Sequence, residues 1–108
     1  YNASMDIDEF QKHALKSVAI TNKDIAALAH RTLGLNGEAG ILSNQIKKII
    51  RDKGGKADEQ DLEVIRKRLG DVPYYTAVLA EYFELSLSDV AKNNMSQSAK
   101  FKEERAKS

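Results

Sequence analysis

The sequence predicts an all-α protein, a bundle of four or five helices around a long central antiparallel helical hairpin. Its 108 residues include one proline and six glycines, too few turn formers for a chain of many short strands. Apolar residues also recur at steps of three and four along most of the chain, which is the spacing of one helix face. A chain of this length has room for one core, so residues 1–108 are expected to form a single domain.

The first helix is expected to begin near Asp6 or Asp8, since either side chain can cap a helix N-terminus. It should end around Ala19. A short turn follows, in which Thr21 or Asn22 would cap the second helix.

The second helix is expected to run from Asp24 for up to about 30 residues, or about 45 Å. Its apolar positions keep steps of three and four, with one double step across a threonine, at Ile25, Leu28, Leu35, Ala39, Leu42, Ile46, Ile49 and Ile50. Gly34, Gly37 and Gly40 each cost such a helix about 1 kcal/mol relative to alanine. Close helix packing and access of a ligand to the backbone are both consistent with these glycines.

The third helix follows a charged loop at 51–58, where Gly54 and Gly55 would stop the second helix. Its apolar positions have the same near-heptad spacing, at Leu62, Ile65, Leu69, Val72, Thr76, Leu79 and Phe83. The second and third helices should therefore pair as an antiparallel hairpin. Pro73 predicts either a kink beside Asp71 or the start of a new helix near Gly70.

A capping box at residues 86–89 predicts the last helix, with a frayed tail at 102–108. Residues 1–5 are expected to be a disordered leader or residues left from cloning. The apolar stripes of the hairpin are long for so small a core. We therefore expect another copy of the chain to cover part of them, in a homo-oligomer that is a dimer or a tetramer.

Composition excludes several classes of protein. The formal net charge is +1, so no overall field selects nucleic acid or an anionic membrane. The chain has no cysteine, which excludes disulfides, thiolate metal sites and a cysteine nucleophile. No apolar run approaches the length of a membrane span, so a cytoplasmic location is expected.

Two acids, Glu38 and Asp71, each lie one position from an apolar stripe, so each should lie at the edge of the core. Carboxylates on two facing helices can hold a hard divalent cation between them. Mg²⁺ keeps several waters in such sites, and a phosphate-bearing substrate usually completes its shell. The spacing alone is weak support, because a helical protein of this size carries many acids.

The residues around these acids add a resemblance that spans nearly the whole chain. The matching segments are 8–11 with Ala14, 37–40, 46–54, 69–75, 79–80, 85–87 and 90–91 with Asn94. In this order they resemble the MazG-like all-α nucleoside triphosphate pyrophosphohydrolases. The resemblance implies hydrolysis of NTPs or dNTPs to the monophosphate and pyrophosphate, a house-cleaning activity that uses Mg²⁺.

The resemblance also implies site residues. Glu38 and Asp71 would be the catalytic and metal-binding acids. Lys48 and Arg51 would bind the triphosphate, and Asn94 would contact the nucleotide. From the residues alone, Lys48 and Arg51 are equally well explained as a basic helix C-terminus that complements the macrodipole.

The chain departs from the family pattern at two positions. The family has Glu three residues after the position of Glu38 and three residues before that of Asp71, where this chain has Ile41 and Arg68. Four carboxylates would carry −4, whereas Glu38, Asp71 and Arg68 sum to −1. The first hypothesis is therefore a MazG-like protein with an impaired Mg²⁺ site.

Two other interpretations of this site remain open. Asn44, Asp52, Glu63 or acids of another subunit could rebuild the metal shell and retain catalysis. Alternatively, Arg68 replaces the metal ion and ties the two acids across the hairpin, which would leave a nucleotide-sensing or structural module.

A different class of function is a helix-turn-helix DNA binder. Residues 87–98 resemble that motif, but the turn between Ala91 and Met95 is one residue too short and lacks its usual glycine. The net charge of +1 does not favour DNA either, so nucleic acid is not the expected partner.

Overall fold

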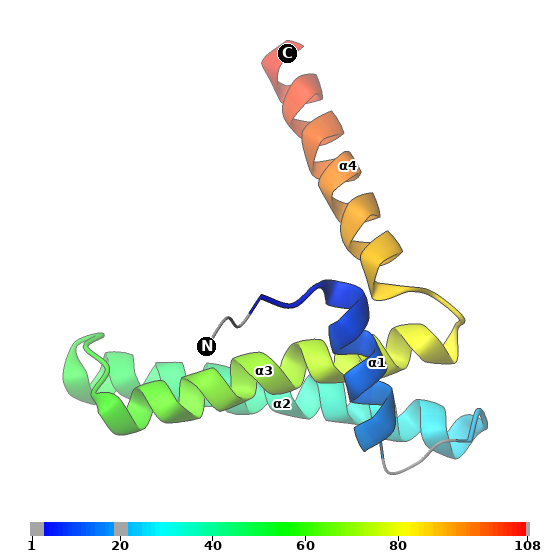
Figure 1. Ribbon diagram of the computed structural model, residues 1–108. Helices are drawn as coiled ribbons and strands as arrows, with labels where there is room; N and C mark the ends of the chain where they lie inside the picture. The colour runs from blue at the N-terminus through cyan, green and yellow to red at the C-terminus, as the bar shows by residue number, and fades with distance from the viewer. Residues whose placement is uncertain (1–3, 19–21, 108) are drawn as a thin grey trace.

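The computed structural model describes residues 4–18 and 22–107, which form four helices. They are α1 (Ile7–Ser17), α2 (Ile25–Lys53), α3 (Glu59–Tyr82) and α4 (Leu87–Lys107). The prediction of an all-α fold is confirmed. Figure 1 shows α2 and α3 side by side and antiparallel, with α1 crossing one side of this hairpin and α4 projecting away from it.

The first two helices are both capped by aspartate. The Asp6 carboxylate accepts a hydrogen bond from the backbone N–H of Glu9 at 2.8 Å, and Asp24 accepts one from Ala27 at 2.9 Å. Each bond satisfies an N–H that the first helical turn leaves without a partner. The cap expected at Thr21 or Asn22 is therefore wrong.

The end of α1 also differs slightly from the prediction. Val18 has extended backbone angles, so the helix ends at Ser17, two residues before the expected end at Ala19. Both Ala19 and Thr21 fall outside the described residues.

The turn of the hairpin follows the expected chemistry. Gly54 ends α2 in the left-handed conformation with φ 60°, as predicted for a helix stop. Asp58 then opens α3 with a capping box, in which Asp58 and Asp61 each accept from the backbone N–H of the other. The helix continues through Pro73 without a break, so a new helix starting near Gly70 is wrong.

The hydrophobic core lies at one end of the hairpin, where α1 crosses α3. It consists of Ala14, Val18, Ala77, Val78 and Leu87. Of the eight buried hydrophobic side chains in the described part of the chain, four are alanines. A single chain therefore buries few large apolar groups, and the half of the hairpin near its turn contributes only Ile49.

Gln11 links three elements at this end of the molecule. Its side-chain amide donates to the carbonyls of Ala77 at 3.1 Å and Leu85 at 3.2 Å, and its oxygen accepts from the N–H of Leu87 at 2.9 Å. The side chain is buried, with 8% of its surface exposed. Gln11 therefore fixes where α4 leaves the end of α3.

Helix α4 is one continuous helix from Leu87 to Lys107. No turn separates Ala91 from Met95, so residues 87–98 do not form the helix-turn-helix that the sequence analysis considered and disfavoured. Ser86 caps α4 as expected, since its hydroxyl accepts from the N–H of Asp89 at 3.0 Å. The helix extends across the segment expected to fray, and it exposes Met95 and Phe101.

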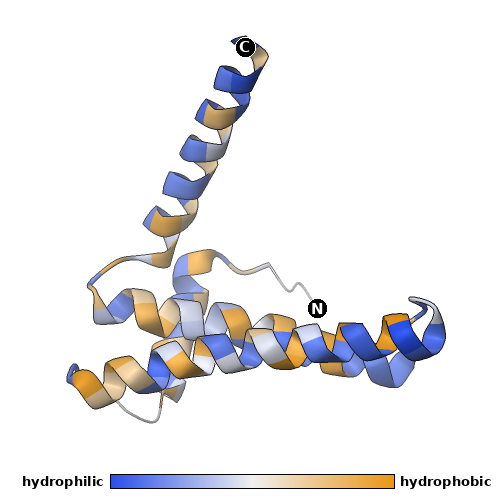
Figure 2. Ribbon diagram, turned by 180° about the vertical axis from the view of Figure 1, so that it is seen from behind, coloured by the Kyte–Doolittle hydropathy of each residue, from blue (hydrophilic) through white to orange (hydrophobic). Residues whose placement is uncertain are grey.

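The seam between α2 and α3 is bridged by polar and aromatic contacts at four levels. Along α2 these levels are Arg31 against Val78 and Glu81, Gly34 against Tyr75, Glu38 against Arg68, and Gln45 against Asp61. The antiparallel pairing is as predicted. However, much of the apolar stripe lies beside the seam and stays exposed, as the orange positions along both helices show in Figure 2.

Candidate functional site: an ion-paired cluster across the hairpin

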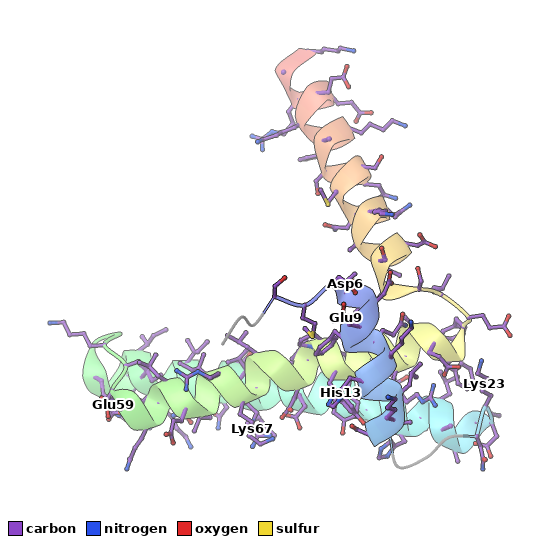
Figure 3. All side chains as sticks on the ribbon, viewed as in Figure 1. Asp6, Glu9, His13, Lys23, Glu59 and Lys67 are labelled. Carbon is purple, nitrogen blue, oxygen red and sulfur yellow. The ribbon has the colours of Figure 1, made fainter. Side chains whose placement is uncertain are left out.

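The two acids singled out in the sequence meet at one guanidinium group. Arg68 of α3 donates from Nη1 to Glu38 Oε2 of α2 at 2.7 Å, and the same nitrogen lies 3.7 Å from Asp71 Oδ2. Lys67, labelled midway along the hairpin in Figure 3, donates to the same oxygen of Asp71 at 2.9 Å. We call Glu38, Lys67, Arg68 and Asp71 the hairpin cluster.

Helix geometry explains why these side chains meet. Arg68 and Asp71 are one turn apart on α3, so both side chains project from the same side of the helix. Glu38 stands across the seam, with 17% of its side chain exposed, against 25% for Arg68 and 28% for Asp71. At this burial the ion pairs are only partly screened by water, and they contribute more than a fully exposed pair would.

The cluster carries no net charge. Glu38 and Asp71 supply −2, and Arg68 and Lys67 supply +2. Ile41, one turn beyond Glu38 on α2, contributes no oxygen, and 44% of its surface is exposed. Arg68 Nε is buried and has no hydrogen-bond partner among the described residues. The guanidinium thus bridges the two carboxylates while one of its own donors stays unsatisfied within the described chain.

The residues present do not fit a Mg²⁺ ion. Magnesium requires several oxygen ligands in octahedral geometry, and both carboxylates here are engaged by basic side chains. Within residues 4–18 and 22–107, no three His, Cys, Asp or Glu side chains converge as a metal-binding group.

The candidate replacement ligands lie far from the cluster. Asn44 is six residues beyond Glu38 on α2, or about 9 Å along the helix, and Asp52 is about 21 Å beyond it. Glu63 is exposed and lies about 12 Å before Asp71 on α3. Within one copy of the chain, these residues do not rebuild the metal shell.

The three residues assigned to substrate binding are also not gathered around the cluster. Lys48 is exposed and about 15 Å beyond Glu38 on α2. Arg51 is bound to Asp52 through two hydrogen bonds, of 2.8 and 2.9 Å. Those bonds raise the pKa of Arg51 and lower the pKa of Asp52. Asn94 lies on α4, which in the described chain packs on α1 and α3 but not on α2.

Sequence reasoning missed Arg31, which is the most deeply buried charged side chain described, with 1% exposed. It donates from Nη1 to the carbonyl of Val78 at 2.7 Å and to Glu81 at 3.0 Å, and its guanidinium lies 5.9 Å from the centre of the Tyr82 ring. A signal was present, because Arg31 falls on the helical stripe between Leu28 and Leu35. A charge at such a position indicates a buried partner on the facing helix.

A second missed cluster ties the turn end of the hairpin. Asp61, with 6% of its surface exposed, accepts from Gln45 at 2.9 Å and from Lys53 at 2.7 Å. Lys53 also donates to Asp58 at 2.7 Å. That bond, followed by the bond from the Asp61 N–H, lowers the pKa of Asp58 from 3.8 to about 2.

This cluster predicts a loss of stability in acid. The pKa of Asp58 is lower in the folded chain, so its contribution is complete above about pH 4 and is lost as the pH falls towards 2. Asp58→Asn keeps a capping side chain but does not titrate. We expect urea midpoints of the variant and the wild type to differ at pH 6 and to converge near about pH 2. A constant difference across this range would contradict the assignment.

Fold and cluster together define an all-α protein whose central hairpin is closed by an internal arginine between two carboxylates. No model of a known protein family matches the chain, and no solved structure matches it. Over 73 residues it is 40% identical to the Gene 37 protein of Mycobacterium phage L5. The matched segment is 68% of this chain and 64% of the phage protein, so the chain spans less than two thirds of that relative.

Among the described residues, none of the four helices combines the length and the apolar character that crossing a membrane requires.

Proposed function

We propose that this protein is a MazG-like nucleotide module in which the guanidinium of Arg68 replaces the metal ion, so that Mg²⁺-dependent pyrophosphohydrolysis is impaired. The observation that carries the proposal is the contact of one Arg68 nitrogen with both Glu38 and Asp71. The MazG-like resemblance of the sequence supports the assignment of these two acids to the ancestral site. Its substrate class would be a nucleoside triphosphate.

The chemistry of such a site explains the impairment. A divalent ion must displace Arg68 from Glu38 and Lys67 from Asp71 before it can bind either carboxylate. The ion must also lose part of a hydration shell that Mg²⁺ releases reluctantly. The ion would polarise the phosphate oxygens and activate a water molecule for attack, and in this cluster the two carboxylates that would hold it are paired with Arg68 and Lys67 instead.

The decisive experiment restores the acids. The double variant Ile41→Glu, Arg68→Glu brings the four positions to −4, and we expect its Mg²⁺ affinity in calorimetry to exceed that of the wild type at least tenfold, about 1.4 kcal/mol. The wild type should release no Mg²⁺-dependent pyrophosphate from a panel of NTPs and dNTPs.

Arg66→Glu is the control for the substitution at Arg68, since it makes the same change of −2 at an exposed position of α3 outside the cluster. It should leave the Mg²⁺ affinity unchanged. Robust pyrophosphate release by the wild type would refute the impairment. A folded double variant that gains no Mg²⁺ affinity would refute the assignment of the ancestral metal site.

The alternative is a purely structural or nucleotide-sensing helical module. It is favoured by the same ion pairs, which join α2 to α3 near the middle of the hairpin. Under this alternative Arg68→Glu alone should abolish cooperative folding, because Glu38, Asp71 and the new carboxylate would repel each other across the seam. Circular dichroism of the single variant therefore separates the two functions.

A further inference from the structure

The outer part of α4 is exposed on all sides. Figure 1 shows this helix leaving the end of α3 and projecting away from the hairpin. Leu87 is buried at the base of the helix, whereas every residue from 92 to 107 is exposed. This exposed part is about 24 Å long. We call residues 92–107 the α4 arm.

The composition of the α4 arm indicates that it gains from support by another molecule. Isolated helices shorter than roughly 15 residues are marginal in water, and most helical stability in proteins comes from packing of one face. The arm also contains four weak helix formers, which are Asn93, Asn94, Ser96 and Ser98. A partner that covers one side of the arm would therefore stabilise its helix.

One side of α4 has the seven-residue repeat of a coiled-coil seam. Leu87, Asn94 and Phe101 are seven residues apart, at the a position of a heptad. Val90 and Gln97 occupy the d position, and we call these five residues the α4 seam. Phe101 exposes 61% of its surface, which is a large apolar area for so polar a helix. An asparagine at an a position fixes the register of a partner helix when it meets another polar side chain.

The charges that flank the α4 seam are basic. At the e and g positions of this heptad the charged residues are Lys100, Arg105 and Lys107. The arm has five basic and two acidic residues, a net charge of +3, whereas the whole chain carries +1 and the rest of it therefore −2. Arg105 lies 5.9 Å from the centre of the Phe101 ring, so positive charge lies beside the largest apolar group of the seam. An acidic partner is complementary to the arm, and a second copy of the arm is not.

The polar and acidic residues of the arm favour a helix over other anionic partners. Asn94 and Gln97 lie in the seam, where a facing helix can supply hydrogen bonds to their amides and lipid tails cannot. Glu103 and Glu104 interrupt the basic residues and would repel the phosphates of a nucleic acid. The pair of Lys107 with Glu103 at 3.5 Å is exposed and contributes little, so it does not oppose a partner carboxylate.

We propose that the α4 arm is the docking surface for an acidic amphipathic helix of another protein. This helix lies along the α4 seam, with its apolar side chains around Phe101 and its carboxylates beside Lys100 and Arg105. Two helices in contact over about 24 Å bury roughly 500 Å² in total, which is the size of a weak and reversible interface. The proposal does not rest on the nucleotide function, because the arm and the hairpin cluster share no residue.

A synthetic acidic helix tests the proposal on the full chain. The probe is a peptide of about four heptads with leucine at a and d, one asparagine at a central a position, and glutamate at e and g. A peptide with lysine in place of each glutamate is the control. Calorimetry should give an affinity at least about tenfold higher for the acidic peptide, and this affinity should fall as salt is added. Moving the asparagine to a d position should weaken binding of the acidic peptide.

Variants of the chain locate the contact. Lys100→Glu reverses a charge beside the seam, and Lys92→Glu makes the same change on the opposite side of α4. Phe101→Ala truncates the largest side chain of the seam, and Leu33→Ala truncates a residue of α2 that is 69% exposed. Lys100→Glu and Phe101→Ala should each weaken binding of the acidic peptide at least about fivefold. Lys92→Glu and Leu33→Ala should leave it unchanged. All four positions are exposed, so each variant should keep its fold, which circular dichroism checks.

Three results would overturn the proposal. The first is an acidic peptide that binds no better than the basic one. The second is binding that Lys100→Glu and Phe101→Ala both leave intact. The third is tighter binding of the chain to phosphatidylserine vesicles or to duplex DNA than to the acidic peptide, which would assign the arm to a membrane surface or to a nucleic acid.

Discussion

Gly34→Val is expected to lower the free energy of unfolding by about 2–3 kcal/mol. A Cβ atom at this position would overlap Cε1 and Cζ of the Tyr75 ring. The ring has little freedom to move, because it packs edge-on against Tyr74 at 5.0 Å and His30 at 6.4 Å between ring centres. The branched side chain would therefore push the two hairpin helices apart. Urea denaturation measures the effect.

Alanine substitutions at the other two glycines of α2 are the controls. Nothing lies within 4 Å of a Cβ atom at Gly37 or Gly40, so each change to alanine should stabilise the chain by about 0.5–1 kcal/mol through helix propensity. Gly34→Ala should instead destabilise it. If all three alanine variants were equally stable, the close approach of Gly34 to Tyr75 would not limit the packing of the hairpin.

Arg31→Ala is expected to cost about 3 kcal/mol. The change removes a side chain with 1% exposure, its hydrogen bonds to Val78 and Glu81, and its packing against Tyr82, and it leaves a cavity between the helices. Glu81 would not be left uncompensated, since Lys23 pairs with it at 3.0 Å and 29% of its side chain is exposed. The cost should therefore stay at the lower end of the range for breaking a buried ion pair.

Two variants separate the parts of this effect. Arg31→Met fills most of the volume without the charge and should cost about half as much, since packing is retained. Arg66→Ala removes an exposed arginine from α3 and should change stability by less than about 0.5 kcal/mol. An Arg31→Ala variant as stable as Arg66→Ala would show that the buried guanidinium contributes nothing net to folding.

The helices could be predicted from the sequence because their signals are local. The heptads of α2 and α3, the stop at Gly54 and the caps at Asp6 and Ser86 each depend on residues within one or two turns. The errors are also local. The second helix is capped by Asp24 rather than by a residue of the preceding turn, because only the aspartate immediately before Ile25 can reach the N–H of Ala27.

The hairpin cluster could be predicted in part. The positions of Glu38 and Asp71 beside the apolar stripes indicated that they would face each other, and the i, i+3 spacing placed Arg68 within reach of Asp71. The sequence leaves three interpretations of the site open, and the ion pair between Arg68 and Glu38 belongs to one of them. The spacing of residues does not distinguish these interpretations, because whether Glu38 faces Arg68 depends on the rotation of α2 about its own axis.

The contacts of Gln11 and Arg31 could not be predicted residue by residue. Each side chain bonds to backbone carbonyls 47 or more positions away in the sequence. Every residue has a backbone carbonyl, so the residue type does not show which carbonyl will accept such a bond. The assigned roles of Lys48, Arg51 and Asn94 came from resemblance. A resemblance in sequence suggests the role of a residue but does not give its distance from other residues. In one copy of the chain, Lys48, Arg51 and Asn94 do not lie together at the hairpin cluster.

The three hydrogen bonds of Gln11 hold α1 to the point where α4 leaves the end of α3. Helix α4 extends about 31 Å beyond it, so a tilt of about 10° at Leu87 would carry the far end of the helix some 5 Å. Any event that rotates α1 and pulls the Gln11 amide from Ala77 or Leu85 would thus be magnified at Phe101. A small displacement near the N-terminus would become a large change of direction at the opposite end of the chain.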